Sequence, residues 1–457
     1  MFAVLEQVHA HARGDFMKKV LTIALPITLQ NIMFASKGLV DVLMLGQLSE
    51  PDLAAIGIAS KAFFVATIIL LGVSTGGGLL AAQHWGAQNR KGVRESTSLS
   101  LFCTLTITMF IVLGICLFAP YLMGVATHSS EVIALGNQYL IITSFSLFGS
   151  AIISSYSASL KSMQQPGICT LISGIGITVN ILLNWLLIFG HLGFPALGIK
   201  GAAIATLVSS SLEVICLFIF LRTRSHLLTL SKSDIRCAIT PANIKQFLTL
   251  SVPTTFNFLI WAGGIFTYHA IMGNTGTQGL AALAVMTPIE SVSLSFLVGI
   301  ANASAVLIGN QLGAKNYDAA YYQAISMLCI AVAVTIAVSL FILSNQGLIL
   351  DQFSAISGET RLLSEKFLTI LSVGIVLRSV PTTLVVGVLR AGGDVKFCLY
   401  QDMLTQWAFG IPLAALSTFW LGLSPEWVFA AFFLETLFKW VASTRRFISR
   451  KWINTLV

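Results

Sequence analysis

Long apolar segments, separated by short polar turns, run along almost the whole chain. A helix needs about 20 mostly apolar residues to cross a hydrocarbon core of about 30 Å. Sequences typical of turns separate the segments, for example at 49–52, 164–167 and 392–394. The pattern predicts an all-α polytopic membrane protein with twelve transmembrane helices. They are expected near 20–46, 53–82, 97–119, 131–160, 167–190, 199–221, 247–272, 279–309, 320–343, 361–388, 396–421 and 426–444.

Composition supports this class and excludes several others. Of the 457 residues, 56% are hydrophobic and 10% are charged, whereas soluble domains carry roughly 25% charged residues. So few charges cannot cover a surface in water, which argues against a soluble enzyme, a nucleic-acid-binding protein or a disordered chain. The net charge of +8 is therefore interpreted as membrane anchoring, and we expect no nucleic-acid partner.

Basic residues fix the expected orientation, because they gather in cytoplasmic loops. With the N-terminus inside, the inner loops hold nearly all of the basic loop residues, whereas the outer loops hold only Lys200, Arg361 and Lys366. We expect a multi-pass protein of the cell membrane, in bacteria the inner membrane, with both termini cytoplasmic. The first residues lack an apolar run followed by a small-residue cleavage site, so no removable signal peptide is predicted.

The two halves of the chain repeat one another. A shift of 227 residues places Pro26 on Pro253, Gly72 on Gly299 and Asn89 on Asn316. Because each half would contain six spans, both halves would insert in the same direction, as two six-helix bundles related by a pseudo-two-fold axis along the membrane normal. The predicted domains are an N-terminal lobe (1–222), a cytoplasmic linker (223–246) and a C-terminal lobe (247–457).

Several motifs together resemble one transporter family. The segments 180–190 and 198–206, with 83–89, 310–316 and 389–394, are similar to those of MATE (multidrug and toxic compound extrusion) transporters. The resemblance covers almost the whole chain and implies an antiporter that exports amphipathic, often cationic, compounds using an H⁺ or Na⁺ gradient. The expected spans 7 and 10 lack the acids of NorM-like members, so the DinF-like branch fits better.

Four polar residues are predicted to lie at one depth near the outer side of the N-terminal lobe. At about 1.5 Å per residue, Asp41, Asn180, Asn184 and Thr206 all fall roughly 9–15 Å below the outer surface. Ionisable groups at membrane depth are functional candidates, and the resemblance assigns the cation site of this lobe to the matching positions. The alternatives are a solvated Asp41, amides that only join helices, and a Thr206 hydroxyl bonded to its own backbone.

Asp41 is the one acid in this predicted cluster. Relatives proposed to bind Na⁺ often carry a second carboxylate where Asn184 stands, so H⁺ is favoured as the coupling ion and Na⁺ stays open. Lys37 and Lys61 are possible charge partners of Asp41, or they extend towards an interface. Pro26 is the predicted hinge at which the first span bends when Asp41 is protonated.

Other ionisable residues occur in later spans. Glu290 and Arg378 lie at similar depth in spans 8 and 10, where they would form a structural or gating pair or line a wet cleft separately. Glu213 and Glu435 are interpreted as packing residues, with Lys439 a candidate partner of Glu435 at i, i+4 spacing. Tyr268 occupies the position that matches Asp41 in the repeat.

The sequence thus favours an H⁺-coupled multidrug efflux antiporter that works by alternating access on small organic substrates. The same antiporter coupled to Na⁺, or a flippase for lipid-linked precursors, remains an alternative. No nucleophile with a base, no metal-ligand cluster and no phosphate-binding loop is evident, so an enzyme, a bound metal and a cofactor are not expected. We predict a monomer in the bilayer.

Overall fold

The protein is described by a computed structural model, which covers residues 14–353 and 357–457. These residues form helices joined by short turns, and no strand occurs among them. Residues 1–13, at which no signal sequence was predicted, lie outside the described part. The helices that correspond to the expected spans of the first half are α2 (Phe16–Leu45), α3 (Glu50–Gly86), α4 (Arg90–Gly124), α5 (Ser130–Ser144) with α6 (Ser146–Ser162), α7 (Pro166–Phe189) and α8 (Ile199–Thr223).

The second half repeats this succession after the short helix α9 (Lys232–Ala238). Its helices are α10 (Pro241–Gly273), α11 (Thr277–Gly313), α12 (Tyr317–Ser344), the short α13 (Gln346–Asp351), α14 (Gly358–Thr382) with η2 (Thr383–Leu389), α15 (Val395–Asp402) with η3 (Met403–Gly410) and α16 (Ile411–Phe419), and α17 (Pro425–Ile448). Two of these spans contain π-helical turns, η2 after α14 and η3 between α15 and α16, and such turns often mark functional sites.

The described helices agree with a chain that crosses the membrane many times. Nine of them are long and apolar enough to span it, and the pair α5–α6, bent by 41°, would be a tenth. The last two expected spans do not qualify as single apolar helices. One is divided into α15, η3 and α16, and α17 carries the charged residues Glu435 and Lys439.

Local sequence signals explain where several helices begin and end. The Asn89 side chain accepts a hydrogen bond of 2.9 Å from the Gly92 amide at the start of α4. Pro166 occupies the first turn of α7, where its missing amide hydrogen has no helical partner to lose. The same helix ends at Gly190, whose φ of 75° favours glycine.

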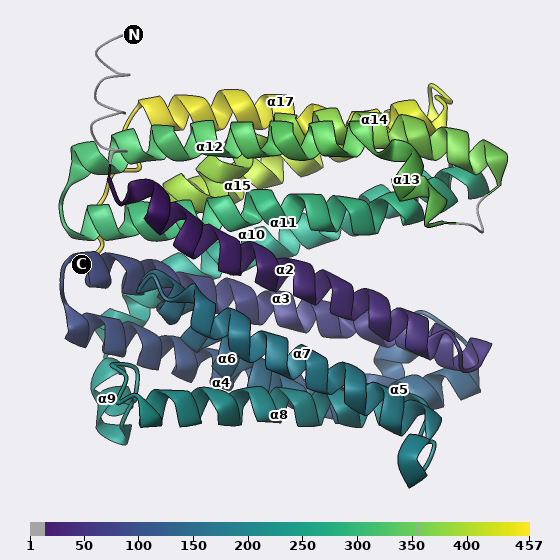
Figure 1. The fold of residues 1–457 in the computed structure, drawn as a ribbon, viewed down its shortest axis with the longest axis horizontal. Helices are drawn as coiled ribbons and strands as arrows, with labels where there is room; N and C mark the ends of the chain where they lie inside the picture. Colours follow the sequence, from purple (N-terminus) through teal and green to yellow (C-terminus); the bar gives the residue numbers. More distant parts are fainter. Residues whose placement is uncertain (1–13, 354–356) are drawn as a thin grey trace. The chain divides into compact units, whose positions relative to one another are not determined.

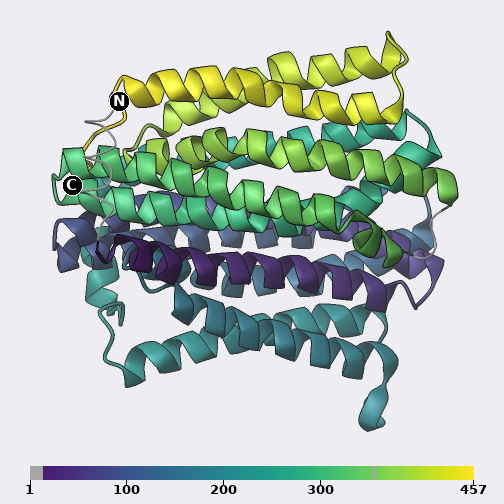
Figure 2. The same ribbon diagram turned by 45° about the horizontal axis from the view of Figure 1, so that its top comes forward.

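The chain divides into two compact units. Unit 1 contains the described residues up to Ile32, residues Gly86–Gln88 and the described residues from Phe256 to Val457, and unit 2 contains Met33–Trp85 and Asn89–Thr255. Within unit 2, α8 packs against α5, α6 and α7. Within unit 1, α11, α12 and α14 pack against one another and α17 packs on α14. Figures 1 and 2 show the helices of each unit running side by side along nearly parallel axes.

The unit boundaries differ from the predicted lobes in a symmetrical way. The beginning of α2 packs with the second half of the chain, in a cluster where Ile23 and Ile27 meet Leu297 and Ile300. The beginning of α10, up to Thr255, packs with the first half. Each half therefore contributes the start of its first helix to the unit formed by the other half.

Two glycines at matching positions of the repeat allow the start of each first helix to pack closely in the unit formed by the other half. A Cβ atom on Gly72 of α3 would lie 2.5 Å from the Thr255 Cα atom of α10. A Cβ atom on Gly299 of α11 would overlap the hydroxyl of Thr28 of α2. Gly72 and Gly299 are repeat partners, as are Thr28 and Thr255, so the same small-residue contact is made once in each unit.

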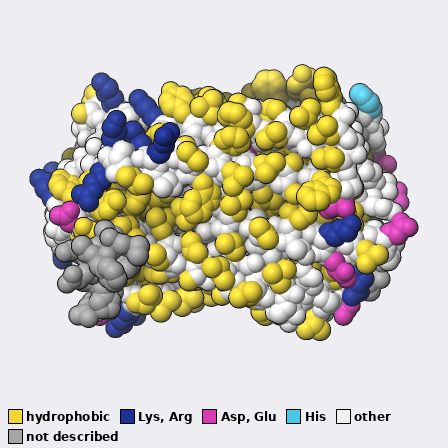
Figure 3. All heavy atoms as spheres, turned by 90° about the horizontal axis from the view of Figure 1, so that it is seen from above, with side chains coloured by type: hydrophobic (Ala, Val, Ile, Leu, Met, Phe, Trp, Pro, Cys, Tyr) yellow, Lys and Arg dark blue, Asp and Glu magenta, His cyan; other side chains and the backbone are white. Residues whose placement is uncertain are grey.

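Side-chain chemistry varies along the face shown in Figure 3. Hydrophobic side chains cover its middle, Lys and Arg gather at one end, and most of the acidic side chains lie at the other end. An apolar middle with polar ends is typical of a surface that lies in a bilayer.

Candidate cation-coupling site

Asp41 lies in the last turns of α2, against two asparagines of α7. The Asn184 amide nitrogen donates a hydrogen bond of 2.7 Å to the Asp41 Oδ1 atom, and Asn180 precedes it by one helical turn. Asn180 and Asn184 are 0% and 1% exposed. Two amides buried this completely at membrane depth require polar partners, and the carboxylate is one of them.

The cluster continues onto α8. The Asn180 amide nitrogen donates to the Thr206 Oγ1 atom at 3.4 Å and to the Ser209 Oγ atom at 3.3 Å. The Asn180 carbonyl accepts a bond of 3.4 Å from Asn184. The structure thus brings together the four residues that the sequence placed at one depth, with Ser209 as an additional member.

One acceptor of the cluster has no partner. The Oδ1 atom of Asn184 is buried, and no hydrogen bond reaches it within the described residues. Such an orphan costs about 1–3 kcal/mol. An amide oxygen beside a carboxylate can accept a bond from a protonated acid or can contact a small cation, so the donor set fits either ion.

The two predicted basic partners of Asp41, Lys37 and Lys61, differ from each other in their relation to the carboxylate. Lys37 lies one turn before Asp41 and interacts with it electrostatically, although the two form no direct ion pair among the described residues. Lys61 is exposed and makes no ion pair with Asp41 in the described part of the chain. Tyr139 of α5, which the sequence did not indicate, lies close enough to Asp41 for the two groups to interact electrostatically.

Glu290 of α11 and Arg378 of α14 form the predicted pair. The Arg378 Nη1 atom donates to the Glu290 Oε1 atom at 2.5 Å, and each side chain is 25% exposed. The guanidinium carbon also lies 4.5 Å from the centre of the Phe433 ring. Whether this pair has a gating role stays a prediction.

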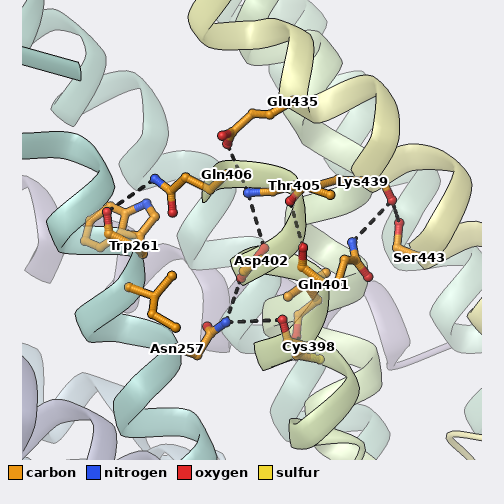
Figure 4. Close-up of polar contacts among 12 residues, drawn as sticks. Asn257, Trp261, Cys398, Gln401, Asp402, Thr405, Gln406, Glu435, Lys439 and Ser443 are labelled. Carbon is orange, nitrogen blue, oxygen red and sulfur yellow. Dashed lines mark hydrogen bonds and ion pairs between the residues drawn. The ribbon is translucent and has the colours of Figure 1, made fainter. Parts of the chain in front are cut away.

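A second buried polar network occupies unit 1 (Figure 4). The Lys439 ammonium lies 3.2 Å from the Asp402 Oδ1 atom and 3.1 Å from the Glu435 Oε1 atom. The Asn257 amide donates to the other Asp402 oxygen at 2.8 Å, and the Tyr268 hydroxyl donates to Glu435 at 2.6 Å. Each carboxylate of this network therefore already has a cationic partner.

The i, i+4 pairing of Glu435 with Lys439 is confirmed, but other members of this network were missed. Asp402 falls inside the expected span 396–421, so an inventory of acids in the spans would have found it. Arg390 falls between the expected spans 361–388 and 396–421, in a predicted cytoplasmic loop, yet its side chain is buried and donates to the side-chain oxygen of Asn257. Its partner lies 133 positions away in the sequence, and no local signal indicates that contact.

Comparison with known proteins identifies the chain's relatives. The model of the MatE family matches residues 26–186 and 253–416, so the match falls once in each half. The uncharacterized transporter YisQ of Bacillus subtilis is 26% identical over 460 residues, which cover 99% of this chain and 98% of that protein. A probable multidrug resistance protein NorM of Thermotoga maritima is 23% identical, covering 96% and 93% of the two chains.

Solved structures share the fold. An outward-facing multidrug resistance MATE family transporter of the MOP superfamily has a TM-score of 0.87 at 18% identity, with 96% of this chain and 98% of that chain covered. A MOP superfamily transporter from Pyrococcus furiosus, described as having a binding pocket of reversed polarity, has a TM-score of 0.85 at 18% identity with the same coverage. The predicted two-bundle fold is thereby confirmed, and this chain belongs to the MatE family of multidrug and toxic compound efflux transporters.

Proposed function

We propose that this protein is an antiporter that exports amphipathic, often cationic, organic compounds and is driven by inward movement of protons. The observation that carries the proposal is the contact of the Asp41 carboxylate with the buried amide of Asn184. An acid at membrane depth with amide neighbours rather than a cationic ion-pair partner is suited to bind and release a small cation.

The ligand chemistry favours a proton over Na⁺. Relatives proposed to bind Na⁺ often carry a second carboxylate at the position of Asn184, whereas this cluster has one carboxylate, that of Asp41, with an amide in place of the second. A single carboxylate needs only one proton to lose its charge. The orphan Oδ1 atom of Asn184 is an acceptor for the hydroxyl of the neutral acid once the side chains rotate.

Alternating access would follow from this change of charge. A proton that enters from outside neutralises Asp41, and α2 bends at Pro26, which interrupts the hydrogen bonding of the helix. We place the protein in the bacterial inner membrane as a monomer with both termini cytoplasmic. The gathering of most Lys and Arg side chains at one end of the face in Figure 3 supports this orientation.

The test is efflux of ethidium from liposomes with the pH gradient and the Na⁺ gradient imposed separately. We expect transport with the pH gradient alone and none with the Na⁺ gradient alone. Transport driven only by Na⁺ would contradict proton coupling. Movement of a lipid-linked precursor without ethidium efflux would instead favour the flippase.

The variant Asn184→Asp sharpens this test because it adds a second carboxylate beside Asp41. We expect it to acquire a response to the Na⁺ gradient that wild type lacks, through an affinity for Na⁺ about tenfold higher than that of wild type, equivalent to about 1.4 kcal/mol. Asn184→Leu is the control, because it removes the amide without adding charge. An equal response of both variants to Na⁺ would contradict the assignment of Asn184 as a ligand position.

A further inference from the structure

The polar cluster around Asp41 continues one turn deeper along the contact of α7 with α8. Gly176 precedes Asn180 by one turn on α7, and Glu213 follows Ser209 by one turn on α8. A Cβ atom on Gly176 would overlap the Glu213 carboxylate, so the acid lies directly against the α7 backbone at this glycine. A ladder of polar residues therefore leads from Asp41 through Asn184, Asn180 and Ser209 to Glu213.

Glu213 lies near the middle of α8, one of the helices long and apolar enough to span a membrane. It stands 14 positions after Ile199, the first residue of α8, and 10 before Thr223, the last, or about 21 Å and 15 Å along the axis at 1.5 Å per residue. Among the described residues, no hydrogen bond or ion pair reaches its carboxylate. The acids Glu290, Asp402 and Glu435 of unit 1 differ in this respect, because each forms an ion pair.

Lys37 lies on α2 one turn before Asp41. One turn before Lys37, Met33 lies beside α7, since a Cβ atom on Gly174 would be 3.7 Å from its Sδ atom, two positions from the glycine that packs on Glu213. The charge of Lys37 interacts with both carboxylates, and among the described residues it forms a direct ion pair with neither. When both carboxylates are ionised, the two acids and the lysine carry a net charge of −1. A net charge at membrane depth is costly, and one proton on either acid removes it.

Other charged groups around Glu213 are few. Of the helices packed against α8, α7 has no Asp, Glu, Lys, Arg or His and carries only the thiol of Cys169 as a titratable group. α6 carries Lys161 in its last turn together with Tyr156, and α5 carries Glu131 in its first turn together with Tyr139. The charge balance at Glu213 therefore depends on Lys37 and, through it, on Asp41.

We propose that Glu213 is the second proton-carrying carboxylate of this transporter, and that Asp41 and Glu213 hold one exchangeable proton between them because they share Lys37 as counter-ion. Protonation of Asp41 leaves Lys37 to neutralise Glu213. Transfer of the proton to Glu213 leaves Lys37 to neutralise Asp41. The inference rests on the proposed function for its role in transport, but the shared proton can be measured without any substrate.

The experiment is infrared difference spectroscopy of the purified full-length protein, titrated from about pH 8 to about pH 5, an interval above the ordinary pKa values of Asp and Glu. A protonated carboxylic acid has a C=O stretching band that an ionised carboxylate lacks. We expect wild type to gain this band and to take up one proton more than Glu213→Gln or Asp41→Asn. Glu131→Gln, which neutralises an exposed acid in the first turn of α5, is the control and should match wild type.

Lys37→Met supplies an independent check. Its loss leaves two acids with no counter-ion, so we expect the band and the proton uptake to become about twice those of wild type. A wild-type band in Glu213→Gln would overturn the proposal, as would an unchanged uptake in Lys37→Met. If Glu213→Gln does not fold, the Lys37→Met result decides alone.

Measurements of transport distinguish a failure of this inference from a failure of the proposed function. If both acid variants lose the shared proton but still export ethidium at the wild-type rate under a pH gradient, the two acids share a proton that does not drive transport. If Glu213→Gln keeps the wild-type C=O band and proton uptake, and only Asp41→Asn loses efflux, proton coupling through Asp41 is supported and the role of Glu213 is refuted.

Discussion

At the scale of single residues, the chemistry of the site depends on how each polar group is satisfied. Asn184 donates to Asp41 while its own carbonyl oxygen stays without a partner. The sequence predicted that Asp41, Asn180, Asn184 and Thr206 share one depth, because helix rise converts residue number into position. It could not predict which amide hydrogen points at the carboxylate, because that depends on how α2 and α7 are rotated against each other.

The Glu290–Arg378 pair provides a prediction at this scale. Replacing Glu290 by Gln leaves a guanidinium without its partner at membrane depth. Breaking a fully buried pair costs about 3–5 kcal/mol, and partial exposure of both side chains reduces the expected loss of folding free energy to about 1–2 kcal/mol. Thermal unfolding in detergent, scored as a double-mutant cycle with Arg378→Gln, measures the coupling.

The double variant should lose less stability than the sum of the two single losses, because no isolated charge remains. Arg378→Gln also loses the stacking on Phe433, so Glu290→Gln is the cleaner single variant. Strictly additive losses would show that the two side chains do not stabilise each other.

At the scale of elements, the turns between helices were easier to predict than the breaks within them. Pro, Gly, Ser and Asn at helix ends have direct physical reasons to be there, and the turns expected at 164–167 and 392–394 separate helices in the structure. The bend at Phe145 between α5 and α6 carries no such signal. Pro381 stands two residues before η2 and Pro412 two residues after η3, but a proline indicates only that the helix is disturbed and not which kind of turn forms.

The linker before α10 provides a prediction on pH. Hydrogen bonds from Ser231, and next to them the Arg94 guanidinium, lower the pKa of Asp234 below its ordinary value of 3.8. An acid with a lowered pKa stabilises the fold while it is ionised, and this contribution disappears as the pH falls through the folded-state pKa. Asp234→Asn should therefore be less stable than wild type at pH 7, by about 0.5–1 kcal/mol for a partly exposed pair.

Thermal unfolding between pH 7 and pH 3 tests this prediction. The gap between wild type and Asp234→Asn should narrow as the acid becomes protonated, because the two side chains then carry the same charge. Asp318→Asn is the control, since Asp318 is 77% exposed and lies 3.7 Å from its basic partner. A gap that stays constant down to pH 3 would contradict the assignment.

At the scale of the whole molecule, the internal repeat determines how each unit is built. Gly72 meets Thr255 in unit 2, and Gly299 meets Thr28 in unit 1. The shift of 227 residues predicted that these positions are equivalent. It did not predict that the start of each first helix packs with the opposite half, because a repeat in the sequence specifies similar bundles and not which bundle receives each helix.

Because the two units make the same glycine–threonine contact, we expect replacement of either glycine by alanine to lower the stability of the fold. Gly72→Ala places a methyl group against the Thr255 backbone, and Gly299→Ala places one against the Thr28 hydroxyl. Overpacking of this kind costs about 1–3 kcal/mol, and Gly72→Ala should cost more because backbone yields less than a side chain. Gly57→Ala, with nothing within 4 Å of the new carbon, is the control on the same helix and should not lower the unfolding temperature.

Proton coupling through Asp41 is the central claim, and it is tested most directly by proton movement that transport itself evokes. Liposomes with a pH indicator inside would report protons that enter as ethidium leaves, in wild type and in Asp41→Asn. We expect a pH change in wild type that depends on ethidium, and none in Asp41→Asn, although that variant still folds. Wild-type proton movement in Asp41→Asn would contradict the claim.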